Sequence, residues 1–140
     1  MDHVGVVVED LAAAVAFFVE LGMEVEGEAT ARVTGWTSSS GWTGVRADMA
    51  VVRTPDGHGP VELSTFRSPV FTASAPRAAV NTPGIPRLTF VVDSVDGVLD
   101  RPRAHGAELV GEVVRYEDIC RYGYVRGPAG VIIGPVEELK

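Results

Sequence analysis

The sequence predicts an α+β fold made of two tandem copies of one β-α-β-β-β unit. The first observation is an internal repeat, in which "HVGVVVEDLAAAVAFFVELGMEVEGE" from residue 3 aligns without a gap with "RLTFVVDSVDGVLDRPRAHGAELVGE" from residue 87. Few residues are identical, but the apolar pattern of the two segments agrees throughout. The second observation is a match between "RTPDG" at residues 53–57 and "RGPAG" at residues 126–130, which a shorter loop in the second copy explains.

The repeat describes one domain, residues 1–140, with two internal units. These units cover residues 1–66 and 85–140. Residues 67–84 lie between them and are rich in Pro, Ser and Ala, which is typical of a linker.

In the first unit, the β-branched run Val4–Val8 predicts a strand. Asp10 is a good N-cap and Gly22 a good C-terminal stop, and the apolar residues between them recur with helical spacing. The polar, glycine-rich segment 34–44, which carries both tryptophans, is expected to be a loop. Three further strands are expected at residues 24–32, 47–53 and 61–66.

The second unit repeats the strand and the helix, with Ser94 as the N-cap and Gly106 as the stop. Pro102 lies inside that helix and removes one backbone donor. It should therefore kink or shorten the helix, at a cost of roughly 3 kcal/mol. Three further strands are expected at residues 108–116, 121–126 and 131–136.

Composition and charge exclude several classes of protein. The chain has 140 residues, of which 46% are hydrophobic and 22% charged, as in an ordinary globular domain. Its net charge of −7 argues against binding to nucleic acid, whose phosphates need a basic face. No apolar run approaches the roughly 18–20 residues of a membrane span, and no signal peptide is expected. Cys120 is the only cysteine, which favours a reducing, cytoplasmic location.

The alternation of residues along the predicted strands separates two faces of the sheet. One face is bulky and apolar, and we expect it to pack against the helices. The other face mixes glycines with polar and charged groups, which is the usual composition of a small-molecule site. We call it the open face, and it comprises His3, Gly5, Val7, Glu62, Ser64, Phe66, Arg87, Thr89, Val91 and Gly134.

A doubled unit that opens with "MDHVGVVVEDLAAAVAFF", carries "VEL" before its midpoint and has "GPAGVII" near its end resembles the vicinal oxygen chelate superfamily, which includes glyoxalase I, extradiol dioxygenases and bleomycin-resistance proteins. The resemblance covers nearly the whole chain. It implies a curved mixed sheet around a cleft, with the helices on the outer face, and often a second chain that completes the cleft. We therefore expect a homodimer. In metal-dependent members, each unit supplies two ligands, one at the start of its first strand and a glutamate on its last.

The resemblance assigns these four positions unevenly. In the first unit they are His3 and Glu62, both of which can coordinate a metal. In the second unit they are Arg87, which cannot lose its proton near neutral pH, and Gly134, which has no side chain. Because a catalytic divalent site usually needs at least three protein ligands, we expect no cofactor. The alternative is a divalent metal, Zn, Ni, Mn or Fe, held by His3 and Glu62.

Arg87 has two possible roles on the open face. It could pair with Glu62 and take the electrostatic place of a metal, or it could hold a carboxylate, enolate or phosphate group of a ligand at two points. Tyr116, Tyr122 and Tyr124 supply aromatic walls nearby. The candidate substrate-binding residues are Arg87, Thr89, Ser64, Phe66, Arg121 and Tyr122, and the candidate general bases are Glu62 and His3.

Three hypotheses on function remain open. The first is a metal-free protein that binds a small organic molecule, such as a sequestering resistance protein. The second is a divalent-metal-dependent lyase or isomerase like glyoxalase I, which uses His3 and Glu62. The third is a metal-free enzyme in which Glu62 or His3 is the general base and Arg87 stabilises an oxyanion. An extradiol dioxygenase is disfavoured, because its iron needs three ligands. The expected partner is a small molecule, with no nucleic acid and no membrane.

Overall fold

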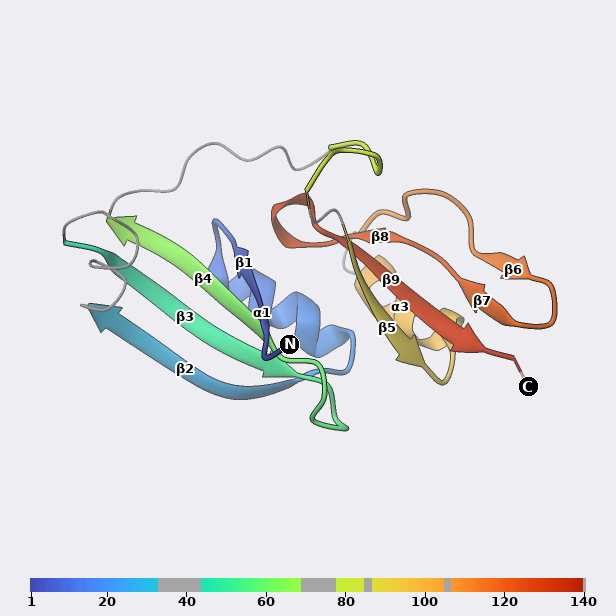
Figure 1. Cartoon of the computed structure of the whole chain (residues 1–140), viewed down its shortest axis with the longest axis horizontal. Helices are drawn as coiled ribbons and strands as arrows, with labels where there is room; N and C mark the ends of the chain where they lie inside the picture. The colour runs from blue at the N-terminus through green and yellow to red at the C-terminus, as the bar shows by residue number, and fades with distance from the viewer. Residues whose placement is uncertain (33–43, 69–77, 85–86, 105–106, 140) are drawn as a thin grey trace. The chain divides into compact units, whose positions relative to one another are not determined.

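The computed structural model of the chain describes residues 1–32, 44–68, 78–84, 87–104 and 107–139. The chain forms two compact units, Met1–Ala73 and Ser74–Lys140, so that the boundary falls inside the predicted linker (Figure 1). Most of the predicted tryptophan loop and half of the linker lie outside the described residues. No helix in the described ranges is long and apolar enough to cross a membrane.

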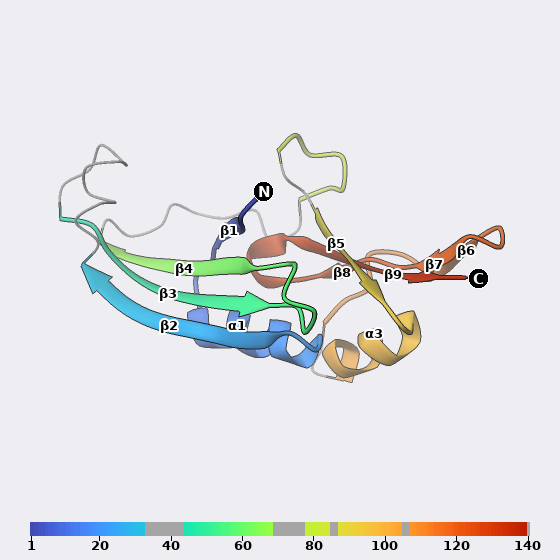
Figure 2. The ribbon, with the colours of Figure 1, turned by 60° about the horizontal axis from the view of Figure 1, so that its bottom comes forward.

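Unit 1 is a mixed sheet with one helix packed on it. Its strands lie in the order β1-β4-β3-β2, with β1 parallel to β4 and the other pairs antiparallel. Figure 2 shows α1 along one face of this sheet. The elements are β1 (Val4–Val7), α1 (Leu11–Glu20), β2 (Glu24–Arg32), β3 (Arg46–Arg53) and β4 (Val61–Ser68).

The ends of α1 are where the sequence predicts them. The Asp10 side chain accepts a hydrogen bond from the Ala13 backbone N–H at 3.0 Å, which satisfies one of the unpaired donors of the first turn. Gly22 follows the helix with φ of 103°, a left-handed conformation that glycine adopts without the steric cost of a Cβ. The helix buries Ala14 and Phe18 against the sheet, as the apolar spacing requires.

Unit 2 repeats this plan with shorter strands. Its strands lie in the order β5-β9-β7-β6, with β5 parallel to β9 and with β8 also paired to β9. The α+β class and the tandem repeat are thus confirmed. The elements are β5 (Arg87–Val92), α3 (Val95–Ala104), β6 (Val114–Tyr116), β7 (Cys120–Tyr122), β8 (Val125–Arg126), the 3₁₀ turn η1 (Pro128–Gly130) and β9 (Ile132–Glu138).

Two predicted strands of unit 2 differ from those observed. The strand predicted at 108–116 is regular only over Val114–Tyr116, with a single bridge from Leu109 to Val125 further upstream. The strand predicted at 121–126 is divided into β7 and β8. Both pieces keep one register along β9, but Pro135 has no N–H to donate where the ladder would continue, so the pairing is interrupted there.

The helix α3 begins at the predicted cap, where the Ser94 hydroxyl accepts a hydrogen bond from the Gly97 N–H at 3.1 Å. The helix includes Pro102, whose ring is fully buried, and it ends at Ala104. The predicted stop, Gly106, lies outside the described residues.

The predicted division of each sheet into two faces is observed. The apolar face carries buried side chains such as Leu63 in unit 1 and Ile133 in unit 2. On the other side, Val91 is 70% exposed, whereas Ser64 and Ile132 are buried, with 4% and 2% exposure. The first and last strands pair in the same register in both units: Gly5 lies opposite Glu62 in unit 1, and Thr89 lies opposite Gly134 in unit 2. Arg87 and Gly134 therefore occupy in unit 2 the positions that His3 and Glu62 occupy in unit 1.

Candidate functional site

The open face of unit 1 carries a histidine–carboxylate pair. His3 lies directly before β1, and its Nε2 is 3.5 Å from Oε2 of Glu62 on β4. Its Nδ1 donates to the Asp2 carboxylate at 2.7 Å. Gly5, the residue opposite Glu62, leaves open space where a side chain would stand, since a Cβ added there would meet no atom of the described residues within 4 Å. The pair is therefore accessible to a small molecule from the side of Gly5.

The charges around His3 favour its protonated form. The hydrogen bond to Asp2 raises the pKa of His3, burial opposes this rise, and the Glu62 charge adds to it. The same hydrogen bond lowers the pKa of Asp2. A protonated imidazole neither coordinates a metal nor accepts a proton. Where His3 is protonated, Glu62 is the proton acceptor of the pair.

We predict that Asp2→Asn lowers the pKa of His3, because the variant loses the charged acceptor that contributes most to the raised value. Because the pKa of His3 is raised in the folded chain, protonated His3 stabilises the fold below the unfolded pKa. This contribution is lost as the pH rises through the folded pKa. An NMR titration of the His3 ring would measure the change. Asp56→Asn is the matched control, since the Asp56 carboxylate accepts hydrogen bonds from Thr54 and His58 and none from His3. If both variants lowered the pKa of His3 equally, the prediction would be wrong.

The donors in place do not fit a complete metal site. Within the described residues, no three His, Cys, Asp or Glu side chains come close enough together to hold an ion. His3 and Glu62 supply two donors, and their repeat positions in unit 2 are an arginine and a glycine. A catalytic zinc site usually takes three protein ligands. The residues at the four repeat positions therefore do not form the ligand set that a metal-dependent reaction would need.

The open face of unit 2 carries a cation stacked on an aromatic ring. The Arg87 guanidinium lies 5.5 Å from the centre of the Tyr124 ring, within the range of a cation–π interaction. Tyr124 in turn covers Gly134, since a Cβ built at Gly134 would come within 2.9 Å of the ring. The same Cβ would be 3.4 Å from the Thr89 hydroxyl. Tyr124 thus fills the space in which a metal-binding glutamate at this position would stand.

The structure places Arg121 away from this face. Its guanidinium binds Asp96 of α3 at 2.9 Å and lies 3.5 Å from Glu137 of β9, whose carboxylate also accepts the Val95 N–H at the start of α3. Arg121 therefore points to the helix side of its sheet. Its neighbour Tyr122 has the opposite orientation, and its ring lies 5.8 Å from that of Tyr124. Of these two predicted binding residues, the structure brings only Tyr122 to the open face.

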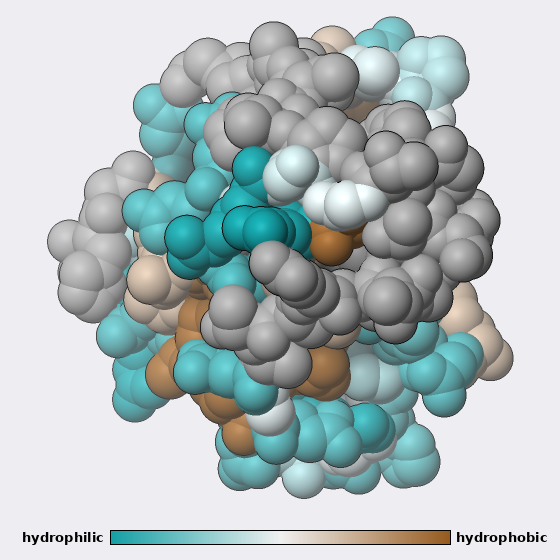
Figure 3. All heavy atoms as spheres, turned by 90° about the vertical axis from the view of Figure 1, so that its left-hand side faces the viewer, coloured by the Kyte–Doolittle hydropathy of each residue, from teal (hydrophilic) through white to brown (hydrophobic). Residues whose placement is uncertain are grey.

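The remaining predicted residues of unit 1 do not gather at one point. Ser64 is on the same face as Glu62 but is only 4% exposed. Phe66 lines a pocket of about 920 Å³ between the first turns of α1 and the sheet. Figure 3 views the molecule from the end at which β2 and β4 finish, where hydrophilic and hydrophobic side chains lie next to each other. Asp48, which is 9% exposed and paired with Arg67, is the buried charge of this pocket.

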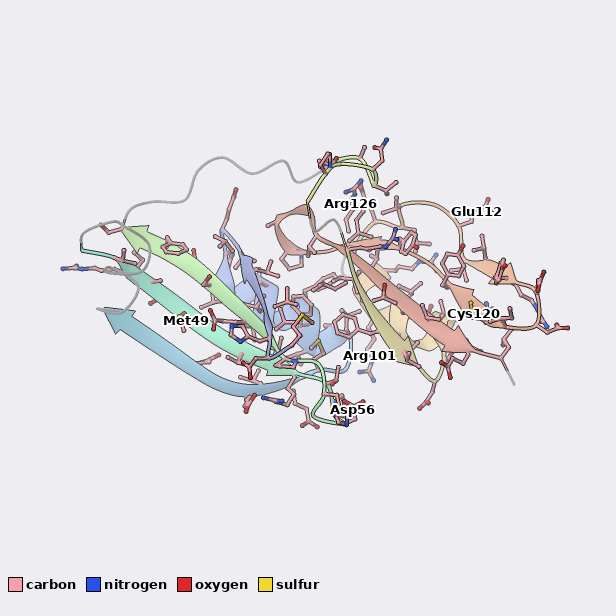
Figure 4. The ribbon with its side chains drawn as sticks, in the orientation of Figure 1. Met49, Asp56, Arg101, Glu112, Cys120 and Arg126 are labelled. Carbon is pink, nitrogen blue, oxygen red and sulfur yellow. The ribbon has the colours of Figure 1, made fainter. Side chains whose placement is uncertain are left out.

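Arg126 is a residue that sequence reasoning did not assign to the site. It belongs to β8 and lies opposite Ile132 of β9, on the same side of the sheet as Arg87, which is opposite Ile132 from β5. The signal that could have found it is the match of "RTPDG" with "RGPAG", whose first residue it is. Figure 4 labels its side chain.

Comparisons of the sequence and of the structure with known proteins point to one superfamily. The profile of the Glyoxalase/Bleomycin resistance protein/Dioxygenase superfamily matches residues 2–124. The structure is similar to that of a glyoxalase family protein from Bacillus cereus, with 42% sequence identity and a TM-score of 0.94, over 100% of this chain and 94% of that one. A search of curated proteins returned no match.

More distant structures share the fold alone. A glyoxalase/dioxygenase from Nostoc punctiforme has 21% identity and a TM-score of 0.70, over 99% of this chain and 90% of that one. The fosfomycin resistance protein FosX from Listeria monocytogenes has 16% identity and a TM-score of 0.65, over 99% of this chain and 92% of that one.

Proposed function

We propose, from the fact that this chain belongs to the glyoxalase/bleomycin resistance protein/dioxygenase superfamily, that it binds a small organic anion without a metal cofactor. The observation that carries the proposal is the pair Arg87 and Tyr124. Arg87 stands at the repeat position of His3, and the Tyr124 ring occupies the space that a second glutamate ligand would need. A fixed positive charge on an accessible face attracts a carboxylate, an enolate or a phosphate instead of a metal.

A catalytic role is the second candidate, and the geometry of unit 1 favours it. Glu62 is half-buried and is held 3.5 Å from His3, beside the open space at Gly5. A carboxylate in this setting can take a proton from a substrate carbon or from water as a general base. Glu62→Gln, which keeps the shape of the side chain, should abolish turnover while ligand binding persists. If Glu62→Gln bound the ligand more weakly but still turned over the bound ligand at the parent rate, Glu62 would not be the general base.

The metal content of the protein tests the proposal directly. We expect protein purified without added metal to hold well under one equivalent of zinc, nickel, manganese or iron per chain, because only His3 and Glu62 supply donors at the repeat positions. Elemental analysis beside a thermal-shift screen of small organic anions would measure this. A stoichiometric metal that resists dialysis would overturn the metal-free proposal and favour a lyase or isomerase like glyoxalase I. The homodimer stays a prediction, for which sedimentation is the measurement.

A further inference from the structure

We propose that Arg126 and Arg87 together form a clasp for a doubly charged oxyanion on the open face of unit 2. This inference rests on the proposed function and deepens it, because it names the charge state of the ligand group and a second arginine that holds it. The juxtaposition follows from the register of the sheet. Ile132 lies between the two arginines, with Arg87 opposite it from β5 and Arg126 opposite it from β8.

The spacing suits two side chains that reach for one group. Residues directly opposite each other in a sheet point to the same face, and neighbouring strands are about 4.8 Å apart. Arg87 and Arg126 are two strands apart, so their Cα atoms are separated by about 10 Å on one face. Arginine carries five N–H donors in a planar fork that matches the oxygens of phosphate and carboxylate groups. Two such forks on one face can neutralise an anion with two charges, whereas a single charge needs only one fork.

One nitrogen of the Arg126 guanidinium has no acceptor in the described part of the chain. Its Nη1 is buried, and among the residues that the structure describes it has no hydrogen-bond partner. A buried cationic donor without an acceptor is costly, and a bound oxyanion would supply one.

The repeat provides an internal comparison. Arg53 opens "RTPDG" in unit 1 as Arg126 opens "RGPAG" in unit 2. The Nη1 of Arg53 donates to the Gly57 carbonyl at 2.6 Å, and its Nε donates to Glu26 at 2.7 Å. Arg53 is therefore satisfied by its own unit, as a structural arginine should be. The buried Nη1 of Arg126 lacks such a partner within the described residues.

The test measures inorganic phosphate and acetate binding to the full chain by calorimetry, at constant ionic strength. We expect phosphate to bind more tightly than acetate, and Arg126→Ala to weaken phosphate binding by roughly 10- to 100-fold, the scale of a lost charge-assisted hydrogen bond. Acetate binding should change less, because one arginine suffices for a single charge. The control is Arg115→Ala, which removes the same charge from an exposed strand of unit 2.

The outcomes separate the clasp from the proposed function. The clasp would be overturned if Arg126→Ala bound phosphate with unchanged affinity, or if Arg115→Ala lost as much phosphate affinity as Arg126→Ala. If only Arg87→Ala lost affinity, the proposed anion site at Arg87 would stand without the clasp. If Arg126→Ala does not fold, Arg126→Lys decides the question: it keeps the charge but not the fork, and we expect at least a severalfold loss of phosphate affinity. A double Arg87→Ala/Arg126→Ala variant should lose less than the product of the single losses, because both side chains hold one group.

Discussion

Arg87→Ala is expected to weaken binding of a small organic anion by about 1.5–3 kcal/mol, the worth of a hydrogen bond to a charged group. The side chain is exposed and lies over the Tyr124 ring, on the face opposite the core, so the variant should fold. Oxalate is a suitable probe, since its adjacent oxygens can accept both arms of a guanidinium. Calorimetry of the parent chain and the variant would give the difference.

Two further variants show whether geometry or charge is responsible. Arg87→Lys retains the positive charge but not the planar fork, so we expect it to recover only part of the lost affinity. Arg115→Ala removes an equal charge at Arg115 of β6, which is paired with Asp118. This variant should bind oxalate as the parent chain does. If Arg87→Ala bound oxalate with unchanged affinity, the proposed anion site would be wrong.

Gly134→Ala is expected to destabilise the fold by about 1–3 kcal/mol, the range of overpacking in a well-packed site. The added Cβ would lie 2.9 Å from one carbon of the Tyr124 ring and 3.0 Å from the next, closer than packed atoms tolerate. The ring must therefore move, and with it the surface on which Arg87 rests. Chemical denaturation would measure the change in the free energy of unfolding.

A double-mutant cycle isolates the contact as the cause. In a Tyr124→Ala background the obstacle is absent, so Gly134→Ala should then cost little. Gly5→Ala is the matched control, because Gly5 also lies in a parallel strand pair of the sheet, opposite Glu62, as Gly134 lies opposite Thr89. Its added Cβ would meet nothing within 4 Å in the part of the chain that the structure describes. Equal destabilisation by Gly134→Ala in both backgrounds would show that the ring is not the reason.

The position of the Tyr124 ring also bears on whether a metal site could be built in unit 2. From the sequence, a glutamate at Gly134 and a histidine at Arg87 would restore the missing pair of ligands to unit 2. The structure shows that the ring of Tyr124 already lies against Gly134, so the glutamate would have to displace it. Unit 2 thus differs from unit 1 in two ways: it lacks both metal-type donors, and the Tyr124 ring fills the space beside Gly134.

The sequence alone determined the repeat, most of the elements and the uneven donor pattern. The cap at Asp10, the stop at Gly22 and the alternation of the strands depend on residues close together in the chain, so local patterns suffice to predict them. The placement of Arg87 and Gly134 at the repeat positions of His3 and Glu62 followed from a gap-free alignment of one strand and a short motif. The shared register of the two units agrees with that placement.

Only the tertiary structure decided which side chains meet. Arg121 of β7 pairs with Asp96 of α3, and Tyr124 covers Gly134 of β9, through contacts that local sequence patterns do not specify. Where Pro135 interrupts the ladder, one predicted strand becomes two, although both pieces keep one register along β9. The alignment of Arg87 and Arg126 across Ile132 likewise depends on two strand registers, which hydrogen bonds between strands set and local sequence does not.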